Sequence, residues 1–335
     1  MTGKSLPPNA IVILAPGRMG DLIAAEPIFR RAHEAEPSRP MVLFTLPPYA
    51  EVMRYCPYLE RIEVCANKAE LRRLAAELPA DCRVIKINFG GEVAGATPAD
   101  NLLHCFQLEN RLPVTDDTAR FYLSDAGSAV LADLPPEYLV FHCCSGGKSR
   151  QWPLKNWRRL AEFCRSSGMP VVEVGYGSVL DLSGPGYFPR CGTVSLDEVG
   201  HIIRHAKAVI GVESGMLHLA NALDTFGFVI TGALRDLPEY NHYCGRYYRG
   251  ENCNFLRFFN CNPFELPYAV VEKVVGEFLA GRTLSFLECE NFLLKEQLAR
   301  QDAAFLRRVR RAAGSFLLKQ KMAIQFRYCP RRPKS

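Results

Sequence analysis

A glycine-containing turn near the start of the chain carries the first residues that could do chemistry. The stretch GRMGD, residues 17–21, follows an apolar run and precedes a segment of helical period. Such turns often bind phosphate, but Asp21 would repel a phosphate by about 1 kcal/mol or more at contact distance. A carboxylate in this place can cap the helix. It can also act as a general base that takes a proton from a hydroxyl, and Gly20 would let a substrate approach the backbone closely.

The spacing of these glycines differs from that of a dinucleotide-binding loop. Gly17 and Gly20 do not complete G-x-G-x-x-G, and no acidic residue clearly ends the next apolar run, residues 41–46, to bind a ribose. A dinucleotide-dependent oxidoreductase is therefore disfavoured, although it stays open as an alternative.

A second turn, in the middle of the chain, combines small residues with cations. Ser145 and two glycines come just after an apolar run, and Lys148 and Arg150 follow. Two cations on such a loop suit an anionic diphosphate. A solvated basic turn would have the same composition, so this stretch alone leaves both interpretations open.

A third turn has groups that suit phosphate and hydroxyls. The apolar run 208–212 leads into Glu213, Ser214 and Gly215, and a helical segment follows. The Ser214 hydroxyl and the first free amides of that helix can hold phosphate oxygens, while Glu213 can accept hydrogen bonds from sugar or ribose hydroxyls. His218, one turn into the helix, either faces this site or packs in the core. The three turns together suit transfer of a sugar from a nucleotide donor.

The elements that must position these turns alternate regularly. Runs rich in Val and Ile predict strands at residues 11–15, 41–46, 61–65, 84–88, 138–143, 171–175, 208–212 and 226–231. Segments of helical period predict helices at residues 21–36, 68–77, 101–110, 156–166, 196–205, 216–223 and 268–280. Strands that are apolar throughout are covered on both faces. We therefore expect an α/β fold with two open parallel sheets, whose strands present ligand sites at their carboxyl ends in the cleft between the sheets.

Composition narrows the class of protein. Of the 335 residues, 48% are hydrophobic and 23% are charged, as in ordinary globular proteins. No apolar run approaches about 18 residues and the N-terminus lacks the features of a signal peptide, so we expect a cytoplasmic protein. The 13 cysteines include no C-x-x-C pair. Cys244, Cys253 and Cys261 fit no common zinc spacing, so we expect free thiols there and no metal site.

Three blocks of the sequence carry a family resemblance. They are GRMGDLIAAEPIFRRA, KSRQWPLKNWRRLAEF and GVESGMLHLANAL. Through them the chain resembles glycosyltransferase family 9, the ADP-heptose:lipopolysaccharide heptosyltransferase family, over roughly residues 11–280. The resemblance implies a GT-B architecture of two Rossmann-like domains, with the donor held mainly by the second. It also implies inversion at the anomeric carbon without a bound metal.

The resemblance also implies roles for individual residues. Asp21 matches the family's proposed base, and Arg150 occupies the position of a phosphate-binding Lys. Glu213 stands where Asp is more usual, which would move its donor contacts by about one methylene. The residues that match the donor-binding turn are Ser214, Gly215, Met216 and His218.

Four further residues complete the expected site. Gly20, Ser145 and Lys148 are placed on the donor side, and Arg18 on the acceptor side. Because Lys148 and Arg150 lie so close in sequence, which of these cations holds the diphosphate stays open.

We therefore expect an inverting, metal-independent glycosyltransferase that needs no cofactor. It would move a sugar, with heptose as the first guess, from a nucleotide donor that is first guessed to be ADP-linked. The acceptor would be a hydroxyl of a lipopolysaccharide, another glycan or a lipid-linked molecule. A catalytically silent GT-B scaffold or sugar-binding module is the alternative. The expected parts are an acceptor domain at residues 1–133, a donor domain at 134–284 and a basic helical tail at 285–335.

The tail concentrates the positive charge of the chain. Residues 292–335 hold twelve Lys and Arg against two acidic residues, whereas the whole chain has a net charge of +6. Apolar residues recur there at near-helical spacing. The tail either packs on the body with a solvated basic face or contacts anionic lipid, as a peripheral protein on the inner face of the inner membrane would. Nucleic acid is not an expected partner, because the rest of the chain is net acidic.

Overall fold

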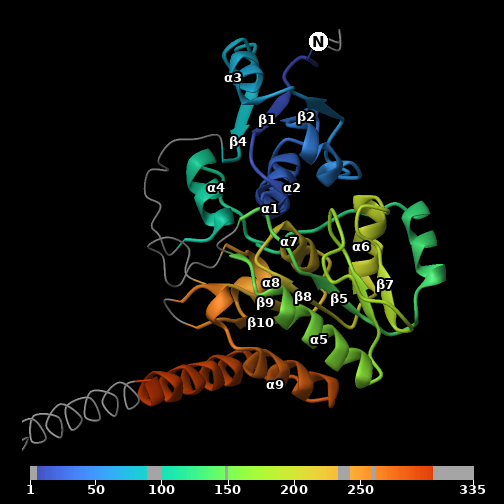
Figure 1. The fold of residues 1–335 in the computed structure, drawn as a ribbon. Helices are drawn as coiled ribbons and strands as arrows, with labels where there is room; N and C mark the ends of the chain where they lie inside the picture. Colours follow the sequence, from blue (N-terminus) through green and yellow to red (C-terminus); the bar gives the residue numbers. More distant parts are fainter. Residues whose placement is uncertain (1–5, 89–99, 148–149, 233–241, 259–260, 305–335) are drawn as a thin grey trace, which may run out of the picture. The chain divides into compact units, whose positions relative to one another are not determined.

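The computed structural model describes residues 6–88, 100–147, 150–232, 242–258 and 261–304. Contacts divide the chain into two units, residues 1–290 and 291–335. Both sheets belong to the first unit, where each forms the centre of its own lobe (Figure 1).

The N-terminal lobe is built on a four-stranded parallel sheet of order β3-β2-β1-β4. Its strands are β1 (Ile11–Ala15), β2 (Met41–Thr45), β3 (Arg61–Val64) and β4 (Arg83–Lys86). β1 lies in the middle, with Ile11 opposite Met41 on one side and Arg83 on the other. Both β1 and β2 are buried along their whole length, which explains their unbroken apolar sequences.

Helices cover both faces of this sheet. The helices are α1 (Met19–Ala24), α2 (Glu26–Ala35), α3 (Lys68–Ala76) and α4 (Leu102–Asn110). Ile11 and Ile13 share a core cluster with α1, α2 and α4, whereas Val12 and Leu14 share another with α3. The alternation of side chains along a strand thus assigns α3 to the opposite face.

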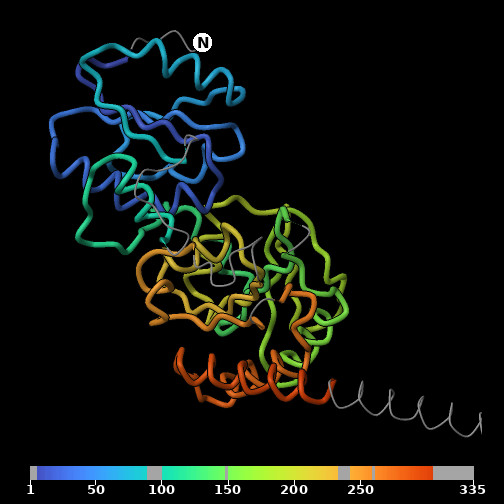
Figure 2. The backbone as a smooth tube through the Cα atoms, turned by 90° about the vertical axis from the view of Figure 1, so that its left-hand side faces the viewer, coloured from blue at the N-terminus to red at the C-terminus, as the bar shows by residue number. Residues whose placement is uncertain are grey.

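The C-terminal lobe is the part of the backbone coloured green to orange in Figure 2. It is built on a six-stranded parallel sheet of order β10-β9-β8-β5-β6-β7. Its strands are β5 (Leu139–His142), β6 (Val171–Glu173), β7 (Tyr187–Pro189), β8 (Ala208–Val212), β9 (Gly227–Ile230) and β10 (Cys253–Leu256). The helices are α5 (Leu154–Ser166), α6 (Leu196–Arg204), α7 (Gly215–Ala222), α8 (Gly245–Tyr248) and α9 (Tyr268–Leu279). Short 3-10 helices occupy Pro47–Met53, Ala126–Asp133 and Pro263–Glu265.

Aromatic contacts show which helices cover one face of the second sheet. Trp157 of α5 meets Phe141 of β5 edge to face, with ring centroids 5.8 Å apart. Phe278 of α9 meets Phe228 of β9 in the same way at 5.2 Å. Residues of α6 and α7 pack on the other face, in the cluster that also contains Val140 and Val209.

The expected fold, two parallel sheets of the GT-B type flanked by helices, is confirmed. All eight expected strands are present, and their ends differ from the expected ends by at most two residues. Two strands escaped prediction, β7 and β10, which are the short outer strands of the second sheet. The single helix expected at residues 21–36 is two helices, because α1 ends at Ala24 and α2 begins at Glu26. Pro27 has no N–H to donate to a carbonyl of the preceding turn, so it cannot continue the hydrogen bonding of α1.

The expected tail falls partly within the described residues. Residues 286–304 are helical, as the apolar spacing predicts, and the arginines at 307–311 lie outside the described part of the chain. Whether the three expected segments behave as separate domains stays a prediction. No described helix has both the length and the apolar character that a membrane span requires.

Candidate functional site

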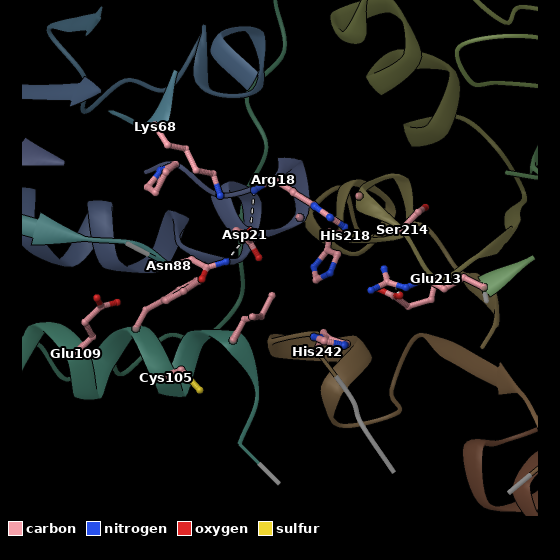
Figure 3. Close-up of a pocket in the computed structure, with 17 residues that line it drawn as sticks. Arg18, Asp21, Lys68, Asn88, Cys105, Glu109, Glu213, Ser214, His218 and His242 are labelled. Carbon is pink, nitrogen blue, oxygen red and sulfur yellow. Dashed lines mark hydrogen bonds and ion pairs between the residues drawn. The ribbon is translucent and has the colours of Figure 1, made fainter. Parts of the chain in front are cut away.

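A pocket of about 550 Å³ opens where the carboxyl ends of the two sheets meet within the first unit (Figure 3). Its lining residues are Pro16, Gly17, Arg18, Gly20, Asp21, Lys68, Asn88, Leu102, Cys105, Phe106, Glu109, Arg150, Glu213, Ser214, Gly215, His218 and His242. Most residues predicted from the sequence therefore meet in one place. They are Arg18, Gly20, Asp21, Arg150, Glu213, Ser214, Gly215 and His218.

Three residues of the expected site do not line this pocket or cannot be placed. Ser145 organises its own loop, where its carbonyl accepts a hydrogen bond from Gln151 over 2.8 Å. Met216 packs against the core cluster. Lys148 lies outside the described residues. Donor contacts by these three residues stay predictions.

Asp21 lies in the first turn of α1, directly after the turn that follows β1. Its Oδ2 accepts a hydrogen bond of 2.7 Å from the backbone N–H of Arg18 and one of 3.1 Å from the side-chain amide of Asn88. A β-carbon on Gly17 would lie only 2.5 Å from that oxygen, so the turn closes tightly over the carboxylate. The helix-capping role of Asp21 is therefore real. It occupies Oδ2, and no hydrogen bond between described residues reaches Oδ1.

The two lobes touch beside Asp21, where α1 packs against α7. A β-carbon on Gly20 would lie 2.7 Å from the ring of His218, and one on Gly215 would lie 3.0 Å from Met19. The close approach of the two helices thus leaves no room for a β-carbon on Gly20 and only a tight fit for one on Gly215. This contact brings Asp21 of the first lobe and Ser214 of the second lobe to the same pocket.

Ser214 directly precedes the first turn of α7 and has an extended backbone. Its hydroxyl is buried and has no hydrogen-bond partner among the described residues. The first N–H groups of a helix also lack intrahelical acceptors, and they carry the positive end of the helix dipole. The start of α7 therefore offers an unused hydroxyl and backbone donors to an anion in the pocket.

Arg150 and Glu213 form an ion pair in this pocket, with Nη1 and Oε2 2.6 Å apart. Burial raises the pKa of Glu213, and the negative charge of Asp21 adds to this effect, while Arg150 and Arg18 oppose it. Arg150 thus lies where the sequence predicts a diphosphate-binding cation, and its charge is partly matched by the neighbouring carboxylate.

Two histidines of the pocket are held neutral. Burial, with a smaller contribution from Arg150, lowers the pKa of His218 to about 3. Burial lowers the pKa of His242 to about 2, and His218 and Arg150 act in the same direction. The ring of His218 lies 4.4 Å from that of Tyr243, and within the described part of the chain its buried Nδ1 has no hydrogen-bond partner. His218 therefore packs against the core and also lines the pocket. The sequence offered these two places as alternatives, and the structure shows both.

The residues on the wall of the pocket opposite α7 were not predicted from the sequence. Lys68 and Asn88 follow β3 and β4, so the rule that ligands bind at the carboxyl ends of strands could have found them. Four residues of α4 carry no comparable signal; they are Leu102, Cys105, Phe106 and Glu109. His242 was not singled out either, because no motif surrounds it.

The cysteines show no metal-binding arrangement in the described chain. Cys244 and Cys253 are buried in the core cluster, and burial raises the pKa of both thiols. No group of three or more His, Cys, Asp or Glu side chains among the described residues could hold a metal ion. The expectation of free thiols at Cys244, Cys253 and Cys261 stays a prediction.

Comparisons with known proteins find similarity to heptosyltransferases. The family model of glycosyltransferase family 9 (heptosyltransferase) matches residues 181–227. Lipopolysaccharide heptosyltransferase 1 of Salmonella typhimurium is 28% identical over 102 residues, which are 28% of this chain and 32% of that protein. Its Escherichia coli counterpart is 28% identical over 112 residues, 30% of this chain and 35% of that protein. The match thus spans about a third of the length of these relatives.

Solved structures resemble this one over most of its length. An Escherichia coli heptosyltransferase with ADP-2-deoxy-2-fluoro heptose has a TM-score of 0.58 at 17% identity, and 80% of this chain and 99% of that chain are covered. A family 9 glycosyltransferase from Veillonella parvula has a TM-score of 0.60 at 14% identity, with coverage of 87% and 99%. At such identities the likeness shows the fold. Together with the sequence matches, it confirms that the chain resembles glycosyltransferase family 9.

Proposed function

We propose that this chain is a glycosyltransferase that moves a sugar from a nucleotide-diphosphate donor to a hydroxyl of an acceptor. The supporting observation is a single pocket that joins a carboxylate of one lobe, Asp21, with a cation and a helix N-terminus of the other, Arg150 and Ser214. Heptose and ADP are the first candidates for sugar and nucleotide. The curated relatives are heptosyltransferases, and one structural neighbour holds an ADP-linked heptose analogue.

The proposed reaction is a direct displacement with inversion. Oδ1 of Asp21 takes the proton of the acceptor hydroxyl as its oxygen bonds to the anomeric carbon of the sugar. The bond from that carbon to the diphosphate breaks, and the nucleoside diphosphate leaves with the electron pair. Arg150, the first amides of α7 and the Ser214 hydroxyl stabilise the charge on the leaving group. These groups supply the positive charge that a metal ion supplies in other transferases, so the proposed mechanism is metal-independent.

Other residues of the pocket have proposed supporting roles. Glu213 accepts hydrogen bonds from sugar or ribose hydroxyls, and Lys148 assists Arg150 at the diphosphate. Gly20 lets α1 pack closely against His218 of α7 at the edge of the pocket. The acceptor contacts Arg18 and Lys68 on the N-terminal lobe. The acceptor is a lipopolysaccharide or another glycan, lipid-linked and assembled at the cytoplasmic face of the inner membrane. There the basic tail adds attraction to anionic lipid, and the protein is cytoplasmic and peripheral.

Calorimetry with ADP, GDP and UDP tests the donor part of this proposal. We expect one nucleoside diphosphate to bind, and Arg150→Ala to weaken it by roughly 10-fold or more, because a charge-assisted hydrogen bond contributes about 1.5–3 kcal/mol. Arg159→Ala, on the far side of the second sheet where Arg159 stacks on Tyr268, is a matched control. Absence of binding by all three nucleotides would defeat the proposal.

Transfer assays separate the proposal from its alternatives. A catalytically silent scaffold or sugar-binding module would bind nucleotide or glycan without releasing nucleoside diphosphate. A dinucleotide-dependent oxidoreductase would be stabilised against heat by a nicotinamide cofactor and not by ADP or UDP. Release of nucleoside diphosphate from a nucleotide sugar, dependent on an added acceptor, supports the transferase alone.

A further inference from the structure

The structure assigns a positioning role to Asn88, a residue of the pocket that no sequence motif contains. We infer that its side-chain amide holds the Asp21 carboxylate in the one orientation that leaves Oδ1 available to the acceptor hydroxyl. This inference rests on the proposed function, since it concerns the same base.

The first step of the argument is the geometry of the carboxylate. The amide of Asn88 and the backbone N–H of Arg18 donate to the same oxygen, Oδ2 of Asp21, over 3.1 and 2.7 Å (Figure 3). Rotation of the carboxylate about its Cβ–Cγ bond, away from the orientation in which one oxygen accepts both hydrogen bonds, would break both of them. With only the N–H of Arg18 present, such a rotation would break a single hydrogen bond. Asn88 therefore converts a helix-capping carboxylate into one with a defined free oxygen.

The second step is the anchoring of Asn88 itself. It follows Ile87, which is buried and whose N–H bonds to the carbonyl of Leu14 over 3.0 Å, so that the pairing of β4 with β1 continues to this point. Asn88 then takes a left-handed backbone with φ of 51°, a conformation that Asn adopts more readily than most residues. The sheet therefore sets where the amide lies, and the turn after β1 sets where Asp21 lies.

The third step concerns charge. Arg18, Lys68 and Arg150 line the pocket, as do Glu109 and Glu213. A cation at position 88 would pair with Asp21 and weaken it as a base, and an anion would repel it. A neutral amide orients the carboxylate and leaves its charge and its second oxygen unused. Among uncharged side chains, Asn also has the short reach and the left-handed tolerance that this position requires.

Two substitutions separate positioning from a purely structural role. Asn88→Gly removes the amide but keeps the left-handed backbone, for which Gly is well suited. Asn88→Asp keeps the shape of the side chain and replaces the donor by a carboxylate beside Oδ2. Asn9→Gly is the matched control: Asn9 also has a left-handed backbone, with φ of 55°, but it precedes β1 at the opposite end of the same sheet.

The experiment measures ADP release from ADP-heptose with heptose-deficient lipopolysaccharide as acceptor, together with ADP affinity by calorimetry. We expect kcat to fall roughly 10- to 100-fold in Asn88→Gly and further in Asn88→Asp, because a misplaced base costs about this much. The KM for the donor and the Kd for ADP should stay within about twofold of wild type, and Asn9→Gly should match wild type throughout. In Asn88→Asp, repulsion between the two carboxylates should also move the acidic limb of the pH–rate profile to higher pH.

Three outcomes overturn the inference. Wild-type kcat in both Asn88 variants shows that Oδ1 needs no such restraint. Equal losses in kcat and in ADP affinity show that Asn88 binds the donor instead. A wild type that binds none of ADP, GDP and UDP and releases no nucleoside diphosphate defeats the proposed function, and the inference falls with it. The first of these outcomes, observed together with normal turnover of the wild type, rejects the inference and leaves the proposed function intact.

Discussion

The guanidinium of Arg150 and the carboxylate of Glu213 lie 2.6 Å apart in the pocket, where the side chain of Glu213 is 12% exposed. A diphosphate that binds Arg150 must therefore compete with this carboxylate. Glu213→Gln removes the competing charge, so inorganic pyrophosphate should bind roughly 3- to 10-fold more tightly to this variant at low salt. Glu213→Asp, which keeps the charge, is the control. Weaker pyrophosphate binding in Glu213→Gln would show that the carboxylate orients Arg150 for the ligand.

Asp21 accepts the hydrogen bond of the Arg18 N–H on Oδ2, whereas its proposed role as a base uses Oδ1, and two substitutions distinguish the two roles. Asp21→Asn can keep the hydrogen bond from the Arg18 N–H but cannot take a proton. Its turnover should fall by on the order of 10²–10⁴ while donor affinity stays nearly intact. Asp21→Ala should show the same loss and should also unfold more easily by about 1 kcal/mol, because the cap is gone. Near wild-type turnover in Asp21→Asn would show that the residue is only a cap.

The unpaired hydroxyl of Ser214 predicts opposite effects on stability and binding. A buried polar group without a partner costs the fold about 1–3 kcal/mol, so Ser214→Ala should leave the free energy of unfolding unchanged or raise it. The same change should weaken ADP binding roughly 3- to 10-fold, through loss of one neutral hydrogen bond. Urea denaturation and calorimetry measure the two effects. Loss of stability with unchanged ADP affinity would assign the hydroxyl to the fold alone.

Buried histidines predict how stability depends on pH. Burial and Arg150 lower the pKa of His218 from 6.5 to about 3, so between these values the unfolded chain binds a proton that the folded protein does not. The free energy of unfolding should therefore fall as the pH drops below about 6.5. His218→Leu should reduce this dependence between pH 7 and 5, which urea denaturation at several pH values measures. An equal pH dependence in His218→Leu and wild type would contradict the assignment.

The basic tail predicts salt-sensitive binding to anionic vesicles. A truncation after residue 304 tests this membrane contact. A truncation nearer residue 285 would remove packed residues, because Phe286 packs edge to face on Phe255 at 6.1 Å and Cys289 is buried. Truncation after residue 304 removes ten Lys and Arg, each contributing about 1 kcal/mol of attraction near an anionic surface. Vesicle binding should be lost while activity on a soluble acceptor is kept. Equal binding to neutral and anionic vesicles, or unchanged binding after truncation, would refute the membrane contact.

The sequence predicts the interior of the fold better than its edges. β1 and β8 have the bounds that their apolar runs predict, because strands covered on both faces have few polar interruptions. β7 and β10 pair on one side only and are three and four residues long, so their sequences carry little periodic signal. The break before Pro27 could have been predicted from the sequence, because Pro disrupts the interior of a helix expected at residues 21–36 but suits the first turn of a new one.

The site could be predicted where residues follow recognisable turns. Asp21, Arg150 and Ser214 stand beside glycines or cations in short motifs, and they meet in the pocket. Lys68 and Asn88 come from turns without such motifs, and their place depends on the strand order β3-β2-β1-β4. The pairing of Arg150 with Glu213 depends on the packing of β5 beside β8, which residue spacing does not reveal.

The close contact of Gly20 with His218 limits how the acceptor range of such a protein can be changed. No β-carbon fits between the two helices there, so packed atoms set the separation of Asp21 from Ser214. A side chain at position 20 would push the two helices apart and change the distance between Asp21, the proposed base, and the proposed donor turn at Ser214. Variant libraries aimed at new acceptors should therefore leave positions 20 and 218 untouched. They should diversify Lys68 and the α4 residues Leu102, Cys105 and Glu109, whose exchange would reshape the pocket and leave that separation unchanged.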